Sequence, residues 1–450
     1  MSPHSSDAQR LLAGMIRNAC VNDGSPGSGG EVRNADLLED YLAGCGLEIL
    51  RAEPAPGRGS LVARLPGTDP DASSLCLLGH IDVVPASAEG WRHDPFGGEL
   101  VDGEIWGRGA IDMLDVVAGM AVAMRTLAVS GRRPAGDIVF AAVADEEAGG
   151  ALGAQWLLDH DDEFGVDCDY VLTESGGLVL GTAEAPEVTI SVAEKGLEWR
   201  RLRVRGVPGH GSTPYGARNA AVLAAEVVRR LVQHQPAARV DDLWQRYVTA
   251  AGFDPDLARR LTDPALLEDA LAELPAGAAH AHACTHTTVS PNAIRADSNV
   301  NVIPDYAEVD VDIRTLPGDG AAEVEAYLAE ALGELAAVVE VETLISSPST
   351  RSPTENPFFT LLGSVVADYY PKARPLPVLA VGSTDARHFR RRGRIAYGFG
   401  LRSRELTQAE FRRRFHGRDE RVDLVSLDLT TRALCDVVGR FATEPVVERG

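Results

Sequence analysis

Short apolar runs alternate with helical patterns in the first part of the chain, and this alternation limits the possible fold more than any other feature. Apolar runs predict strands at residues 60–64, 74–80, 137–144 and 170–174. Apolar residues at helical spacing predict helices at 116–130 and 151–160. Strands that alternate with helices predict a doubly wound α/β sheet with helices on both faces. Ligands of such a sheet bind at the carboxyl ends of its strands.

A different pattern begins at about Pro186. Two strands, 198–206 and the shorter 188–193, are expected to pair through a turn at Lys195-Gly196, and a helix follows at 217–235. We expect 198–206, which carries several arginines, to be an edge strand open to pairing with a second copy.

More strands follow a polar helical stretch, residues 236–282, that has no clear assignment. Strands at 285–294 and 307–314 and a helix at 321–335 complete a small α+β domain with an antiparallel sheet. A Ser/Thr/Pro-rich linker starts at Ser346, and the α/β pattern then resumes. A large domain with a mixed sheet, residues 1–187 and 346–450, is thus expected to be interrupted by a smaller one, residues 188–345.

The charge of the chain excludes some partners. It has 66 acidic and 43 basic side chains in 450 residues, a net charge of -23, which repels nucleic acid and anionic membranes. The sequence shows no secretory signal and no apolar stretch long enough to span a bilayer. Its six cysteines form no CxxC pair, so we expect no disulfide framework and a cytoplasmic location.

Histidines and carboxylates follow the predicted strands. The motifs GHIDVVP, GRGAIDM, ADEEAGG, YVLTESGG and FHGRDERV contain His80, Asp82, Asp112, Asp145, Glu146, Glu147, Glu174 and His416. Each of these residues has an ordinary alternative, such as a loop histidine, a solvated carboxylate or an acidic helix start. Together, at strand ends, they favour one site, because buried charges must be paired or bind metal. Imidazole and carboxylate ligands suit zinc and similar metals.

The ordered set resembles a known metallopeptidase family. This family contains aminoacylase, acetylornithine deacetylase, succinyl-diaminopimelate desuccinylase, glutamate carboxypeptidase and carnosinase-type dipeptidases. The matched strings run from about Leu75 to His416 and include GHIDVVP, WxxDPF, DGEIWGRGAIDM, ADEEAGG, GHGSTP, NVIP and GSTDAR. The run from Trp91 to Asp112 is most similar to the aminoacylase and carboxypeptidase S branch.

The resemblance implies a hydrolase with two divalent metal ions, zinc or alternatively cobalt or manganese. One ion would be held by His80, Asp112 and Glu174, and the second by Asp112, Glu147 and His416. Asp82 would orient His80 by accepting a hydrogen bond from its ring. A water bound to the metals would be the nucleophile and Glu146 its general base.

The small domain would act as a lid and as the dimerisation domain of a homodimer. The resemblance implies that His210, in GHGSTP, stabilises the oxyanion in the partner subunit's site. It also implies that Arg314, with Asn301 of NVIP, binds the carboxylate of a small amide or short peptide substrate. The ordinary alternatives are a glycine-rich turn at His210 and a strand end at Arg314.

One departure from the family pattern affects the expected activity. Leu114 and Asp115 stand where relatives have lysine and glycine. A non-catalytic relative that binds metal or peptide is therefore the alternative to a hydrolase, and a purely structural dimerisation protein is a third reading. Glu146 favours the hydrolase, because a binding protein needs no base. The sequence does not determine whether the substrate is an N-acyl amino acid or a dipeptide.

Overall fold

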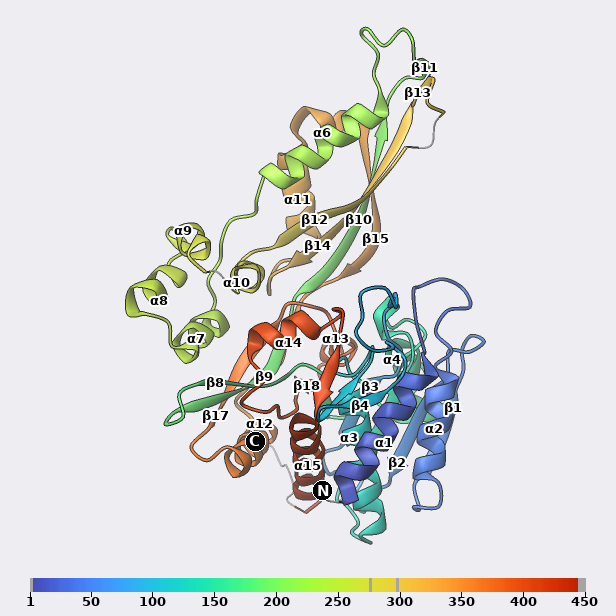
Figure 1. Cartoon of the computed structure of the whole chain (residues 1–450), viewed down its shortest axis with the longest axis vertical. Helices are drawn as coiled ribbons and strands as arrows, with labels where there is room; N and C mark the ends of the chain where they lie inside the picture. Colours follow the sequence, from blue (N-terminus) through green and yellow to red (C-terminus); the bar gives the residue numbers. More distant parts are fainter. Residues whose placement is uncertain (1–2, 275–276, 297–298, 444–450) are drawn as a thin grey trace.

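The computed structural model describes residues 3–274, 277–296 and 299–443, and its largest element is a mixed sheet (Figure 1). Its strands follow the order β1-β2-β6-β3-β7-β18-β9-β16, and β8 and β17 also pair with β9. They are β1 (Glu48–Ala52), β2 (Ser60–Leu65), β3 (Leu75–His80), β6 (Ile138–Val143), β7 (Tyr170–Thr173), β8 (Gly176–Gly181), β9 (Pro186–Glu194), β16 (Thr350–Arg351), β17 (Arg374–Ala380) and β18 (Ile395–Gly398). A separate small sheet joins β4 (Glu99–Val101), β5 (Glu104–Trp106) and β19 (Arg421–Asp423).

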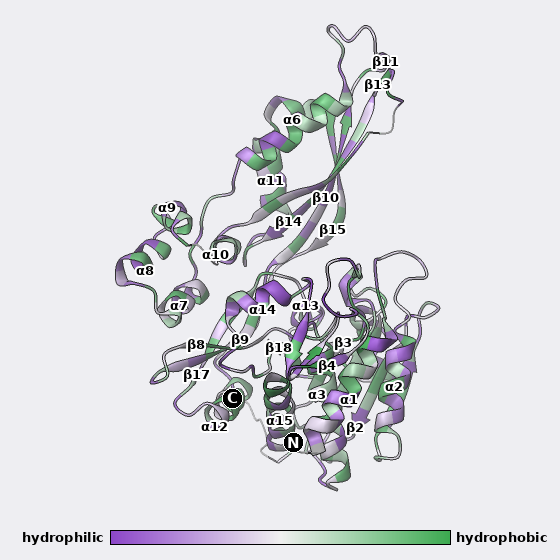
Figure 2. Cartoon of the chain, in the orientation of Figure 1, coloured by the Kyte–Doolittle hydropathy of each residue, from purple (hydrophilic) through white to green (hydrophobic). Residues whose placement is uncertain are grey.

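Helices cover both faces of the large sheet. In β3, Leu75 and Leu77 belong to one hydrophobic core while Cys76 and Leu78 belong to another, because successive side chains point to opposite faces. The first core includes residues of α1 (Pro3–Asn18), α2 (Val32–Leu42), α3 (Leu114–Val129), α12 (Pro357–Tyr369) and α15 (Leu424–Phe441). The second includes residues of α4 (Ala154–Asp159), α5 (Asp161–Phe164) and α13 (Ala386–Arg391). This arrangement confirms the doubly wound α/β fold, and Figure 2 shows α3 as largely hydrophobic.

The small domain has an antiparallel sheet in the order β12-β14-β10-β15. Its strands are β10 (Gly196–Arg205), β12 (Thr288–Arg295), β14 (Tyr306–Thr315) and β15 (Val339–Ser347). Alternate residues of β14 are buried, as the sequence predicted, and pack against α6 (Ala220–Gln233) and α11 (Ala321–Leu332). A 3-10 turn, η2 (Gly333–Val338), precedes β15. At the end of this domain farthest from the large sheet, β11 (Gly209–His210) pairs with β13 (Val302–Ile303) (Figure 1).

The stretch with no clear assignment forms a cluster of short helices. It comprises α7 (Asp242–Ala251), α8 (Pro255–Leu261), α9 (Leu267–Ala272) and α10 (Ala278–Thr285). Trp244, Leu261 and Leu271 form a separate core with Leu376 of β17, so the cluster packs on the large domain. Asp241 and Asp254 cap α7 and α8 by accepting backbone N–H bonds.

Two predictions about strands are wrong. The segment 188–193 lies in β9, which pairs within the large sheet and not with β10. The chain crosses from one sheet to the other at Lys195, whose Nζ donates to the carbonyls of Ala283 and His286, 2.9 and 2.7 Å away. We therefore move the proposed start of the small domain from residue 188 to Gly196.

The prediction that β10 lies at an edge of the small sheet is also wrong. This strand pairs with both β14 and β15, so it is a central strand. Its arginines are matched by acidic residues on the neighbouring strands, with Arg201 2.7 Å from Asp310 and Arg203 2.7 Å from Glu342. Cross-strand ion pairs of this kind make a charged strand compatible with a central position.

All six cysteines are free, in agreement with the expected absence of a disulfide framework. In the part of the chain that the structure describes, no helix combines the length and apolar character needed to cross a membrane.

Candidate metal centre

The predicted ligands meet at one edge of the large sheet. His80 ends β3, Glu174 follows β7, and Glu146 and Glu147 lie in η1 (Glu146–Ala148) just after β6. Because β3 is parallel to both β6 and β7, the carboxyl ends of these strands lie together. Asp112 precedes α3, and His416 follows α14 (Gln408–Arg414), so distant parts of the chain complete the site.

The five residues form two groups that share Asp112. His80 Nε2 lies 3.3 Å from Asp112 Oδ1 and 3.8 Å from Glu174 Oε1. His416 Nε2 lies 2.7 Å from Asp112 Oδ2 and 3.2 Å from Glu147 Oε1. Within each group the ligand atoms lie within 4.8 Å of one another. Two imidazoles and three carboxylates, one of them shared, fit two divalent cations of the zinc type.

The electrostatics of the centre favour bound cations. Burial raises the pKa of Glu146 and Glu174 well above their usual range, and neighbouring carboxylates add to the rise for both. Burial alone would raise the pKa of Asp112, but hydrogen bonds from His416 and His80 hold that pKa below its usual range. The centre gathers more carboxylates than its two imidazoles balance, and metal ions would relieve this excess.

His80 is oriented through its second ring nitrogen. Nδ1 of His80 lies 3.1 Å from the backbone carbonyl of Asp82 and 3.5 Å from the carboxylate Oδ1. The resemblance implied that this carboxylate accepts the bond, whereas the carbonyl is the closer acceptor. Either contact directs Nε2 toward Asp112 and Glu174. The Asp82 carboxylate in turn accepts from Asn22 Nδ2 at 2.8 Å and from the Glu147 backbone N–H at 3.2 Å.

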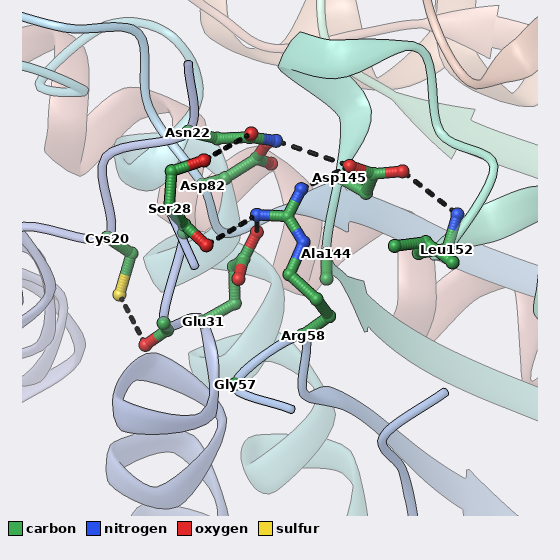
Figure 3. A network of polar contacts seen from close by, with 12 residues as sticks. Cys20, Asn22, Ser28, Glu31, Gly57, Arg58, Asp82, Ala144, Asp145 and Leu152 are labelled. Carbon is green, nitrogen blue, oxygen red and sulfur yellow. Dashed lines mark hydrogen bonds and ion pairs between the residues drawn. The ribbon is translucent and has the colours of Figure 1, made fainter. Parts of the chain in front are cut away.

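A buried network that the sequence did not predict supports this arrangement (Figure 3). Arg58 bonds to Asp145 and lies 2.8 Å from Glu31 Oε1, and Asn22 Nδ2 lies 3.4 Å from Asp145 Oδ1. Burial, with the nearby Asp82, raises the pKa of Glu31 to about 7. The network fixes Asp145, which precedes η1 and therefore Glu146.

The departure at Leu114 and Asp115 has a structural counterpart. Asp115 is fully buried and pairs with the buried Arg402, which lies 287 residues later in the chain. Burial raises the pKa of Asp115, and Arg402 opposes that rise. The acidic side chain therefore belongs to a buried ion pair and is not among the groups of possible metal ligands.

A cavity of about 650 Å³ extends from the metal centre to the small domain. Arg314 lines it, and its Nε donates to Asp312 Oδ1 at 2.8 Å. Trp199, also in the lining, donates to the same oxygen at 3.0 Å, so Asp312 positions both side chains. Apolar residues form much of the remaining wall, among them Leu178, Leu197, Ile345, Val378 and Phe411.

His210 and Asn301 do not join this site within one chain. They are exposed in and beside the β11–β13 pair, and the Asn301 carbonyl accepts from the Gly211 N–H at 2.7 Å. His210 Nδ1 lies 2.8 Å from Ser212 Oγ. Neither residue lines the cavity.

Comparisons with known proteins agree with this geometry. The sequence model of peptidase family M20/M25/M40 matches residues 76–440. The chain is 27% identical over 402 residues to the N-fatty-acyl-amino acid synthase/hydrolase PM20D1 of Xenopus tropicalis, covering 87% of this chain and 77% of that protein. It is 28% identical over 367 residues to aminoacylase-1 of Sus scrofa, covering 81% of this chain and 80% of that protein.

Solved structures share the fold. The metallo-carboxypeptidase Sso-CP2 of Sulfolobus solfataricus superposes with a TM-score of 0.74 at 15% identity, covering 98% of this chain and 100% of that one. Human carnosine dipeptidase 1 gives a TM-score of 0.69 at 15% identity, covering 98% and 96%. The expected resemblance is therefore confirmed: the chain belongs to peptidase family M20/M25/M40 and is a metal-dependent hydrolase of peptide or linear amide bonds.

Proposed function

We propose that the protein uses two divalent metal ions of the zinc type to cleave an amide bond in a small substrate with a free carboxylate. The ions would be held by His80, Asp112, Glu147, Glu174 and His416. The observation that carries this proposal is the pair of ligand groups sharing Asp112, with Glu146 beside them and Arg314 in the same cavity. The names of the relatives favour an N-acyl amino acid as substrate, and a dipeptide is the second candidate.

The chain's own residues supply proton transfer and orientation. Divalent cations, when bound, would polarise the scissile carbonyl and lower the pKa of a water molecule. Glu146 follows the strand that positions Glu147, so its carboxylate reaches the space beside the ligands. One carboxylate oxygen of Glu146 accepts a proton from the attacking water. Glu146 then donates this proton to the leaving nitrogen. Burial raises the pKa of Glu146, which suits both halves of this transfer.

Arg314 is proposed to hold the substrate carboxylate. Its Nε donates to Asp312, and in the described residues its two Nη groups donate no hydrogen bond. A guanidinium with free Nη donors inside a cavity can bind a carboxylate in a bidentate manner. The apolar wall suits an apolar acyl group or side chain on the same substrate.

We expect Arg314→Met to lower kcat/KM for an N-acyl amino acid on the order of 100-fold, because one partner of a desolvated charge pair is lost. The wild-type enzyme should cut the free acid far better than the corresponding amide, and the variant should lose this preference. Steady-state kinetics with both substrates measure the effect. Arg201→Met is the matched control, since Arg201 pairs with Asp310 and does not line the cavity. Equal cleavage of acid and amide by the wild type would contradict the assignment.

We propose that the active form is a homodimer in which His210 completes the partner's site. His210 is exposed in β11, and the β11–β13 pair lies at the end of the small domain farthest from the large sheet (Figure 1). Val207, Tyr215 and Val300 near this pair are large hydrophobic side chains at least half exposed, as expected of a surface that a second copy covers. Closure of the small domain over the metal centre would also exclude bulk water from the reaction.

Mixing two inactive variants tests the dimer. His210→Ala and Glu146→Gln chains should each lack activity, yet a mixed dimer contains one site with an intact Glu146 and an intact partner histidine. We expect partial activity to return when exchanged chains are assayed. Subunit exchange shown by tagged chains, without recovered activity, would mean that His210 acts in its own chain or has no role.

A further inference from the structure

A histidine pair and a glutamate meet in the α7–α10 cluster, outside the candidate metal centre. His282 lies in the last turn of α10 and His286 directly follows the helix, and their rings stack with centroids 4.1 Å apart. Glu268 of α9 faces them, with Oε1 2.9 Å from His286 Nε2. The ligand atoms of the three residues lie within 4.8 Å of one another.

Contacts of Nδ1 fix the orientation of the His286 ring. Nδ1 lies 3.1 Å from the carbonyl of His282 and 3.0 Å from Oγ1 of Thr285. The carbonyl can only accept, and the Thr285 hydroxyl already donates to the carbonyl of Ala281 at 2.7 Å. Nδ1 therefore faces two oxygen acceptors, and Nε2 faces a third, Oε1 of Glu268. Histidines that bind metal are held in the same way, through a bond from the other ring nitrogen.

The 2.9 Å separation of His286 Nε2 and Glu268 Oε1 fits either a proton shared by the two atoms or a cation bound to both, because two atoms each about 2.1 Å from an ion lie roughly 3 Å apart. A second proton on His286 would form an ion pair with Glu268. The ring of His282 places a second imidazole nitrogen within 4.8 Å of the same carboxylate oxygen, an arrangement that the ion pair alone does not require. A cation bound to all three residues would take the place of this proton, and because the two rings are nearly parallel, the His282 side chain would turn to direct a ring nitrogen at the ion.

We propose that Glu268, His282 and His286 form a third metal site, for zinc or a similar transition-metal ion. Two imidazole nitrogens and one carboxylate oxygen are zinc ligands, and four residues is a common spacing for two histidines that bind one ion. His286 is 2% exposed and Glu268 70% exposed, so the site opens to solvent on one side, where water can complete the coordination.

The position of the site connects it to the substrate cavity. His280, on the same helix, lines that cavity, and Lys195 at the crossing between the two sheets holds the carbonyls of Ala283 and His286. An ion that joins α9 to α10 therefore fixes a helix that contacts both the cavity and the junction of the domains. The site is structural and contributes no atom to the reaction.

Zinc content of the full-length chain tests the proposal. We expect His282→Gln and Glu268→Gln each to hold one ion fewer than the wild type after dialysis against micromolar zinc. Loss of one ligand should weaken affinity by about 10- to 100-fold or more, since even outer-shell partners have effects of that size. Asp269→Asn, which removes a charge from the same helix outside the cluster, is the matched control and should retain all ions. His286 is left intact because its burial makes a substitution there prone to misfolding.

A second measurement separates this site from the catalytic centre. In a His80→Ala background, cobalt titration should still give absorption from the third site, and adding His282→Gln should remove the part of the absorption that corresponds to one ion. The difference of one ion between wild type and His282→Gln stands even if the two-metal proposal fails. Equal zinc content and equal zinc-induced shifts in Tm for the wild type and His282→Gln would overturn the proposal and leave an ion pair only.

Discussion

The Glu146→Gln enzyme is expected to lose turnover and to keep its metal ions. The amide has nearly the same shape as the carboxylate but cannot take a proton from water. Loss of a general base lowers the rate by roughly 100- to 10,000-fold, and the fall is larger when the same group also protonates the leaving nitrogen. Glu146 belongs to neither group of candidate ligands, so metal content should stay near that of the wild type.

Glu147→Gln is the matched comparison for this variant. Its side chain is the neighbouring carboxylate, and Glu147 Oε1 lies 3.2 Å from His416 Nε2 in the second ligand group. We expect this variant to lose metal affinity, with activity partly restored by excess metal. Rates and metal content are measured together for both variants. A Glu146→Gln enzyme with near-normal kcat would show that Glu146 is not the base.

The Arg402→Met variant is expected to be much less stable than the wild type. Arg402 and Asp115 form a buried pair, and Asp115 Oδ1 and Arg402 Nε have no hydrogen-bond partner in the described residues. Removal of the arginine leaves a buried carboxylate without a cation, a change that lowers the free energy of unfolding by about 3–5 kcal/mol. Denaturant unfolding at several pH values measures the loss.

The pH dependence of this loss follows from the pKa of Asp115. Burial raises that pKa in the folded protein, and without Arg402 it should rise further. The folded state then binds a proton more readily than the unfolded state. The loss of unfolding free energy is therefore complete at pH values above the raised pKa of Asp115, and it becomes smaller as the pH falls through that pKa. Arg404→Met, an exposed arginine in the same loop, should change stability by about 0.5 kcal/mol or less.

A second substitution shows whether the buried charge causes the effect. Asp115→Asn added to Arg402→Met removes the unpaired carboxylate, and much of the lost stability should return along with the loss of pH dependence. An Arg402→Met chain that unfolds at the same denaturant concentration as the Arg404→Met control would contradict the account of the pair.

The sequence alone predicted the doubly wound sheet and the residues that meet at its edge. His80 and Glu174 end apolar strands, and parallel strands end at a common edge, so local patterns were sufficient to bring them together. Local patterns could not show which sheet a strand joins. Residues 188–193 are apolar enough to belong to a strand of either sheet. The arginines of β10 indicated an exposed strand, because their acidic partners on β14 and β15 cannot be recognised from the sequence.

The supporting residues of the site were not predictable for a related reason. Arg58 bonds to Asp145 across 87 residues and Arg402 to Asp115 across 287, and no local motif specifies either partner. A buried arginine has the same sequence signature as an exposed one until the fold supplies its carboxylate. The cluster of Glu268, His282 and His286 also combines two segments, although the spacing of its histidines was visible in HAHACTH.

Anomalous diffraction at the metal absorption edge, from crystals of the metal-loaded Glu146→Gln chain, tests the two-metal centre most directly. This variant is suited to the measurement because it should bind both ions without turning over substrate. The account predicts two peaks at the edge of the large sheet, one among His80, Asp112 and Glu174 and one among Asp112, Glu147 and His416, with Asp112 bridging them. A single peak there, or two peaks that do not share Asp112, would contradict it.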